Sequence, residues 1–89
     1  MIEIKNKNGE EFIVIVDMEG SKTEHTVTLD NDYYKTLTRG KITKEELIKK
    51  SFEFLLERES NESILSRFNL KVIKRYFPEY EEKIKLYLI

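Results

Sequence analysis

The stretch ITKEELIKKSFEFLLERE, residues 42–59, carries the clearest structural signal in the chain, because its apolar residues recur at the spacing of a helix. Thr43 and Glu46 fit the capping-box pattern, in which each side chain accepts a hydrogen bond from the backbone amide of the other residue. We therefore expect an amphipathic helix from Thr43 to Glu59, with Phe54 at the edge of its apolar side and only partly covered. The residues on that apolar side are Leu47, Ile48, Ser51, Phe52, Leu55 and Leu56.

Three segments before this helix have the character of β-strands. Residues 1–7 and 11–18 flank Asn8-Gly9, the dipeptide most typical of a tight type I′ hairpin turn. Residues 22–29 alternate apolar and polar side chains, as expected of a strand with one covered face. These patterns predict a three-stranded antiparallel meander over residues 1–29.

The second of these strands contains the segment FIVIVDM and is apolar on both of its faces. Ile13 and Ile15 share the face that would point away from the helices, and apolar side chains in that position need a cover. We therefore identify Ile13 and Ile15 as a candidate partner surface. The cover is the chain's own terminal segment, another protein or a second copy of the chain.

The second part of the chain, residues 30–89, is predicted to be helical. Asp30 and Asn69 are suitable N-cap residues, and Pro78 disfavours a helical conformation at the residue before it. Together with the strands, this predicts a single compact α+β domain over residues 1–89, in which the three-stranded meander is followed by three to five helices. Besides 43–59, the expected helical segments are 31–39, 64–68, 70–77 and, unless it forms a terminal strand, 80–89.

The composition narrows the class of protein. The chain has 89 residues, of which 37% are charged, and its net charge of −1 argues against a general affinity for polyanions. It contains no cysteine, which excludes disulfides, thiolate catalysis and metal sites with cysteine ligands. No segment approaches the roughly 18 apolar residues of a membrane span, and the first ten residues lack the apolar run of a signal peptide. We therefore expect a cytoplasmic protein, and the richness in Lys, Glu and Ile favours an A+T-rich or heat-adapted microbe, hence a prokaryotic source.

The residues that carry most protein chemistry are sparse. His25 is the one histidine, whereas metal sites of the usual kinds need several His, Cys or grouped carboxylates. The three glycines are isolated, so no phosphate-binding loop is present. We expect no catalytic, cofactor-binding or metal-binding residues. An enzyme would require a pocket around His25 with a carboxylate within hydrogen-bonding distance.

Basic and aromatic residues alternate in the segment RFNLKVIKRYF, residues 67–77. Lys71, Lys74 and Arg75 share one helix face, which is compatible with a nucleic-acid surface. The alternative is the polar back of an amphipathic helix whose aromatic residues lie in the core. Base stacking needs exposed aromatic rings, so the core spacing of these rings favours the alternative.

Residues 25–59, HTVTLDNDYYKTLTRGKITKEELIKKSFEFLLERE, resemble a ribbon-helix-helix DNA-binding unit in the order of strand, short helix, glycine-containing turn and capped helix. The resemblance implies that the strands of two chains pair into one ribbon and that Thr26 and Thr28 enter the major groove of DNA. It also implies that the start of the second helix, at Thr43 and Lys44, holds a phosphate. Residues 66–84, SRFNLKVIKRYFPEYEEKI, look like the tail of small uncharacterised prokaryotic proteins, a resemblance that implies no activity.

Two hypotheses of function follow. The first is a small non-enzymatic interaction protein whose partner, another protein or a second copy, covers the outer face of the sheet. The second is a dimeric DNA-binding regulator of the ribbon type. Pairing of the 22–29 strand within its own chain favours the first hypothesis, and pairing between chains favours the second.

Overall fold

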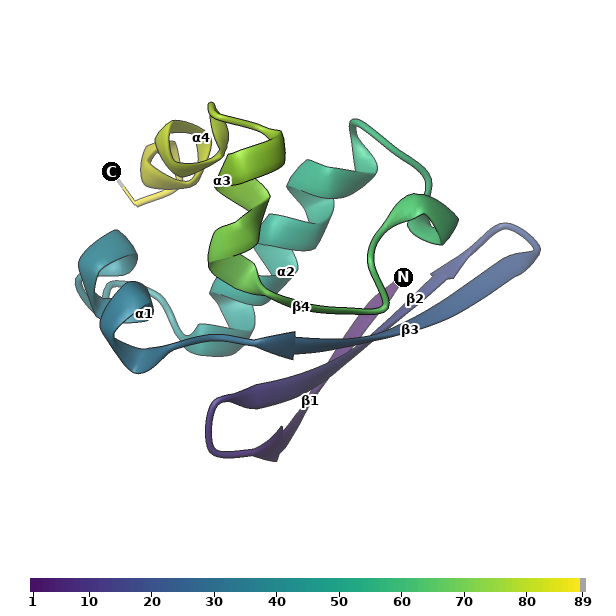
Figure 1. Cartoon of the computed structure of the whole chain (residues 1–89), viewed down its shortest axis with the longest axis horizontal. Coiled ribbons are helices and arrows are strands. Elements are labelled where there is room, and N and C mark those ends of the chain that lie inside the picture. The colour runs from purple at the N-terminus through teal and green to yellow at the C-terminus, as the bar shows by residue number, and fades with distance from the viewer. Residues whose placement is uncertain (89) are drawn as a thin grey trace.

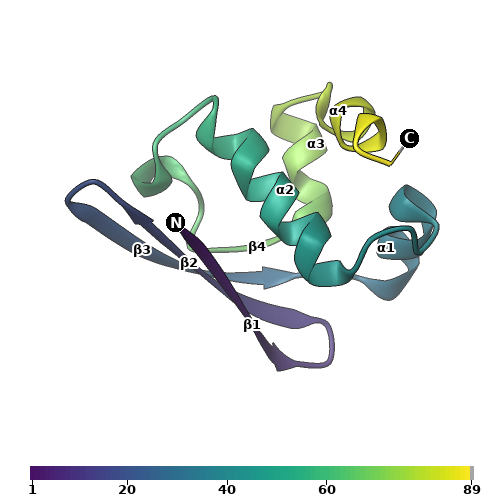
Figure 2. The same cartoon turned by 180° about the vertical axis from the view of Figure 1, so that it is seen from behind.

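The computed structural model describes residues 1–88, which form a four-stranded sheet with four α-helices on one side of it (Figure 1). This arrangement confirms the α+β class and the three N-terminal strands. The longest helix, α2 (Lys44–Leu56), lies across the inner face of the sheet, as the view from behind shows (Figure 2). Within residues 1–88, no helix combines the length and the apolar character needed to cross a membrane.

The sheet has the order β1-β2-β3-β4. Strands β1 (Ile2–Asn8), β2 (Glu11–Met18) and β3 (Ser21–Thr28) form the predicted antiparallel meander. A short fourth strand, β4 (Arg67–Asn69), pairs in parallel with the end of β3. β3 therefore has neighbours of its own chain on both edges at Thr26, Val27 and Thr28.

The first hairpin does not contain the predicted type I′ turn. That turn requires a positive φ at both central residues, but Asn8 keeps a negative φ and pairs with Glu11. Gly9 alone has a positive φ, of 37°. The ladder is irregular between Asn6 and Asn8, which shifts the turn by one residue along the chain.

The prediction of a short helix over 64–68 is wrong. The chain instead forms a 3₁₀ turn, η1 (Asn61–Ser63), and the backbone of the next residue, Ile64, is extended. The carbonyl of Ser66 then accepts a hydrogen bond of 2.8 Å from the amide of Thr26, and this bond draws the chain into the sheet as β4. The inward spacing of Ile64 and Phe68 suited a helix, but backbone pairing with β3 determines the conformation here.

Helix α2 (Lys44–Leu56) begins as predicted and ends three residues before Glu59. The Glu46 amide donates to the Thr43 hydroxyl at 3.0 Å, and the Thr43 amide donates to the Glu46 carboxylate at 2.8 Å. Both halves of the capping box are therefore present.

The apolar side of α2 packs on the inner face of the sheet. Leu47, Ile48 and Phe52 have no exposed surface, whereas Leu56 is half-buried. Phe54 is buried and not partly covered as predicted, because its ring lies edge-on to those of Phe77 and Tyr80 at centroid distances of 5.8 and 5.4 Å. The strand residues that complete this core are Phe12, Val14, Val16 and Val27.

The remaining helices follow the sequence prediction with local differences. The segment predicted over 70–77 begins as a 3₁₀ turn capped by the Asn69 side chain, and Tyr76 is 65% exposed instead of facing inward. The C-terminal segment is a helix and not a strand; its last residue, Ile89, lies outside the described residues. The helices are α1 (Asn31–Thr38), η2 (Leu70–Val72), α3 (Ile73–Tyr76) and α4 (Tyr80–Leu86).

A buried hydrogen bond joins α2 to α4. The Ser51 hydroxyl lies 2.7 Å from the Leu47 carbonyl, to which it donates, and 2.6 Å from the Tyr80 hydroxyl. Since Ser51 donates its one proton to the carbonyl, Tyr80 donates to Ser51. Burial raises the pKa of the Tyr80 hydroxyl above its ordinary value of 10.0.

We expect this burial to make the protein less stable at high pH. The unfolded chain loses the Tyr80 proton near pH 10.0, whereas the folded chain keeps it, so the contribution is complete below pH 10.0 and is lost as the pH rises towards the higher folded pKa. Tyr80→Phe should therefore show a shallower alkaline decline in the free energy of unfolding, measured by urea denaturation. Tyr87→Phe, at a half-exposed tyrosine, is the matched control and should keep the wild-type decline. Equal declines in wild type and Tyr80→Phe would contradict the assignment.

Candidate functional site

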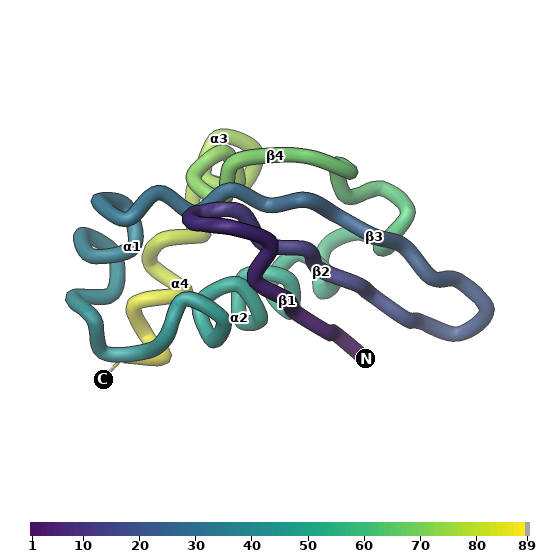
Figure 3. Tube along the Cα trace, turned by 90° about the horizontal axis from the view of Figure 1, so that it is seen from below, coloured from purple at the N-terminus to yellow at the C-terminus, as the bar shows by residue number. Residues whose placement is uncertain are grey.

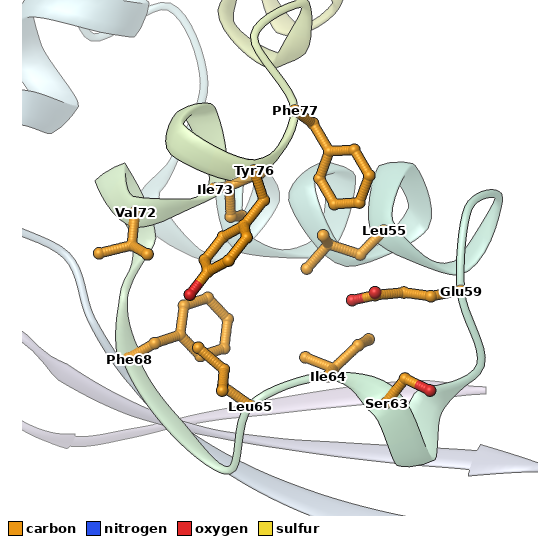
Figure 4. A pocket seen from close by; sticks show the side chains of 10 residues that line it. All are labelled: Leu55, Glu59, Ser63, Ile64, Leu65, Phe68, Val72, Ile73, Tyr76 and Phe77. Carbon is orange, nitrogen blue, oxygen red and sulfur yellow. The ribbon is translucent and has the colours of Figure 1, made fainter.

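An apolar groove opens between the segment that follows α2 and helix α3 (Figure 4). Leu55, Ile64 and Ile73 line it and are at most 6% exposed, whereas Leu65 and Tyr76 beside them are 49% and 65% exposed. The volume of about 170 Å³ resembles that of the engineered cavity of about 150 Å³ that admits benzene. The groove therefore has room for one aliphatic or aromatic side chain.

Polar contacts beneath the groove hold one of its walls in place. The Asn61 side chain, which is buried, donates to the Thr23 hydroxyl at 3.1 Å and so ties η1 to β3. The Nδ1 atom of His25 lies 2.7 Å from the carbonyl oxygen of Leu65. Since a carbonyl only accepts, Nδ1 donates this bond. These contacts place Leu65 at the surface in a defined position.

His25 is therefore a packing residue on the inner face of β3. It is 2% exposed, its Nε2 atom bonds the Thr23 hydroxyl at 2.9 Å, and its ring packs on Phe52 at a centroid distance of 5.4 Å. Within the described residues, no carboxylate forms a hydrogen bond or ion pair with it.

Of the described residues 1–88, Glu59 supplies the one carboxylate that lines the groove. Figure 4 shows its side chain directed towards the space between Leu55 and Ile64. The neighbouring cation, Arg58, is engaged elsewhere, since it donates to Glu79 at 3.2 Å and to the Phe54 carbonyl at 2.9 Å. Among residues 1–88, no lysine or arginine lies within ion-pair distance of Glu59.

The outer face of the sheet holds the predicted partner surface. Ile13 and Ile15 are partly exposed, and the helices lie on the other side of the sheet (Figures 1 and 3). On β1, Lys5 stands opposite Ile13 and Glu3 stands opposite Ile15. Both isoleucines therefore lie between charged or polar side chains of the neighbouring strands, with Thr26 and Glu24 opposite them on β3.

The predicted nucleic-acid contacts are spread over different parts of the molecule. Thr26 and Thr28 lie on the outer face of β3, between β2 and β4. Lys44, at the start of α2, contacts the Asn31 side chain and lies over the Tyr34 ring at 5.7 Å. Arg75 is exposed on α3.

Lys71 and Lys74 line a polar depression together with acidic residues. Lys71 lies 3.2 Å from Asp30, and Lys74 lies 3.6 Å from Glu81. The depression contains two lysines and four carboxylates, so acidic residues outnumber basic ones; the carboxylates are those of Glu10, Asp30, Asp32 and Glu81. The structure therefore gives this region a mixed charge and not a positive one.

Sequence reasoning missed the groove residues Leu65 and Tyr76. One local signal was present, because Ile64 and Leu65 are adjacent apolar residues outside a regular helix and cannot both face the core. Tyr76 offered no such signal, since its helical spacing predicted burial. Tyr76 is the last residue of α3 and lies exposed beside the groove.

Comparisons with protein-family models, with curated proteins and with solved structures find no match for this chain. The part of the chain that the structure describes contains no group of three or more His, Cys, Asp or Glu side chains suited to hold a metal ion. The function is therefore inferred from the surfaces described above.

We expect Asp30 to contribute to stability in a pH-dependent way. Hydrogen bonds from Lys71 and then Asn69 hold the pKa of its carboxyl below the ordinary value of 3.8. This contribution is present above pH 3.8 and is lost as the pH falls through the lower folded value. Asp30→Asn should lower the urea midpoint near neutral pH and reduce the loss of stability on acidification. Asp32→Asn, at an exposed neighbour in the first turn of α1, should have a smaller effect on both; equal effects of the two substitutions would argue against the assignment.

Proposed function

We propose that this protein is a small non-enzymatic binding module that holds a partner polypeptide through the groove beside α3. The observation that carries the proposal is the position of Leu65 and Tyr76, two large and exposed apolar side chains that flank the same apolar groove. Exposed apolar side chains gathered around a concave site are typical of protein-binding surfaces. The cytoplasmic setting expected from the composition is part of this proposal.

The occupant that best fits the groove is an apolar side chain next to a lysine or arginine. The volume suits one leucine or phenylalanine side chain, and Glu59 offers a carboxylate to an adjacent cation. Arg58 is held by Glu79, so the described chain itself does not neutralise this carboxylate. An acidic residue beside the apolar anchor would be repelled by Glu59 and should be disfavoured.

The groove alone provides limited affinity. Burial of one leucine or phenylalanine side chain contributes about 1.5–3 kcal/mol before the costs of association. We therefore expect the partner to make further contacts around the groove. Ile13 and Ile15 form a separate apolar surface on the outer face of the sheet and remain a second candidate for such contacts.

The alternative is a ribbon-type DNA-binding regulator. It requires β3 to pair with the same strand of a second chain, but β2 and β4 flank β3 at Thr26 and Thr28. Lys71 and Lys74 are also paired with carboxylates. These observations favour the protein-binding proposal.

Selection from a random peptide library displayed on phage tests the proposal. Wild-type protein should enrich peptides with a leucine, phenylalanine or tyrosine next to a lysine or arginine. Leu65→Ala and Tyr76→Ala should each weaken the selected peptide at least tenfold in fluorescence anisotropy, which corresponds to about 1.4 kcal/mol. Glu59→Gln should reduce the preference for the basic neighbour while apolar binding persists.

The control is Tyr87→Ala, which removes another half-exposed tyrosine that does not line the groove. It should bind the selected peptide as wild type does, and all variants should keep the wild-type urea midpoint. Selection of peptides without an apolar anchor would contradict the proposal. So would an affinity for the selected peptide that is the same in wild type, Leu65→Ala and Tyr76→Ala. Binding of duplex DNA at low salt that is lost in Thr26→Ala and Thr28→Ala would favour the alternative.

A further inference from the structure

Strand β1 lies at the edge of the sheet, and one of its edges has no neighbour within the described chain (Figure 2). Met1 and Asp17 exchange two backbone hydrogen bonds of 2.8 Å. The backbone groups of successive residues in a strand point to opposite edges. Since those of Met1 point towards β2, those of Ile2, Ile4 and Asn6 point away from it, towards the open edge.

We propose that a second copy of this chain pairs with that edge, with the two β1 strands antiparallel and a two-fold axis at Ile4. In this register Ile4 stands opposite Ile4 of the second copy, and Ile2 stands opposite Asn6. Each of these pairs exchanges two backbone hydrogen bonds. The pairing of β1 with β2 is irregular between Asn6 and Asn8, so the regular part of β1 ends at Asn6. The pairing between the two copies therefore also ends at Asn6.

Charge complementarity selects this register. Glu3 of one copy stands opposite Lys5 of the other, and the two-fold axis produces this pair twice. Glu3 and Lys5 form a non-hydrogen-bonded pair, the kind of position at which facing side chains of antiparallel strands come closest. A shift by two residues would instead oppose Glu3 to Glu3 or Lys5 to Lys5. Within one chain the two side chains are 3.9 Å apart and 56% and 63% exposed, so they are free to change partners.

The apolar side chains on the inner face of β1 favour the same pairing of two copies about Ile4. Ile2 and Ile4 are partly buried residues that pack on the core from the edge of the sheet. Pairing about Ile4 brings the isoleucines of the two copies together and removes more of their surface from water. Directly opposed residues share one face of a sheet, so the helices of both copies lie on the same side of a continuous eight-stranded sheet.

Sedimentation equilibrium over a range of concentrations tests the proposal, with wild type, Glu3→Lys, Lys5→Glu and the double variant. Wild type should dimerise. Each single substitution places like charges opposite each other at two positions and should weaken the dimer about tenfold. The double variant exchanges the two charges and should recover wild-type affinity. An equimolar mixture of the two single variants should form heterodimers in native mass spectrometry, because both facing pairs are then complementary.

Glu24→Lys is the matched control, since it makes the same change in charge at an exposed position on the same face but on β3. It should leave the dimer unchanged. The proposal would be overturned if the wild type is a monomer at millimolar concentration, or if substitutions at positions 3 and 5 leave the dissociation constant of the dimer unchanged. Failure of the double variant to recover would overturn it too. These residues lie outside the groove, so peptide binding by the groove and dimerisation through β1 can fail independently.

Discussion

The packing of α2 on the inner face of the sheet is the interaction on which the rest of the structure depends. Leu47, Ile48 and Phe52 are fully buried there, and the capping box fixes where the helix begins. A chain of this size buries only about 60% of the surface that its unfolded form exposes, so it has one core and little reserve of stability. Helix α4 docks on α2, mainly through Phe54 and the Ser51–Tyr80 hydrogen bond, and α1 and α3 in turn contact α4.

The short strand β4 determines where the groove forms on the surface. Its parallel pairing with β3 draws the chain after η1 along the edge of the sheet and away from α2. The side chains of Asn61 and His25 hold this segment against β3. The space between the segment and α3 is the groove. The exposure of Leu65 is therefore a consequence of backbone pairing beneath it.

Three surfaces remain available for interaction, and their chemistry differs. The groove is apolar with one carboxylate, the outer face of the sheet presents Ile13 and Ile15 among charged neighbours, and the β1 edge presents backbone groups with a self-complementary charge pattern. Lys71 and Lys74 are paired with Asp30 and Glu81, so the polar depression that they line is not positively charged. This distribution suits recognition of polypeptides, in which side-chain pockets and strand edges supply the contacts.

The sequence by itself determined the features that depend on residues close together in the chain. The start of α2, the three N-terminal strands and the boundary before Pro78 rest on capping, alternation and backbone restrictions that act over a few residues. Tertiary structure decided β4, the burial of Phe54 and the exposure of Tyr76, and it decided that Leu65 and not Ile64 lies at the surface. A three-residue strand is too short to show a period, and its conformation depends on hydrogen bonds to β3, some 40 residues earlier. The groove could not be predicted for the same reason, since its walls come from separate segments that meet only when the sheet and helices have packed.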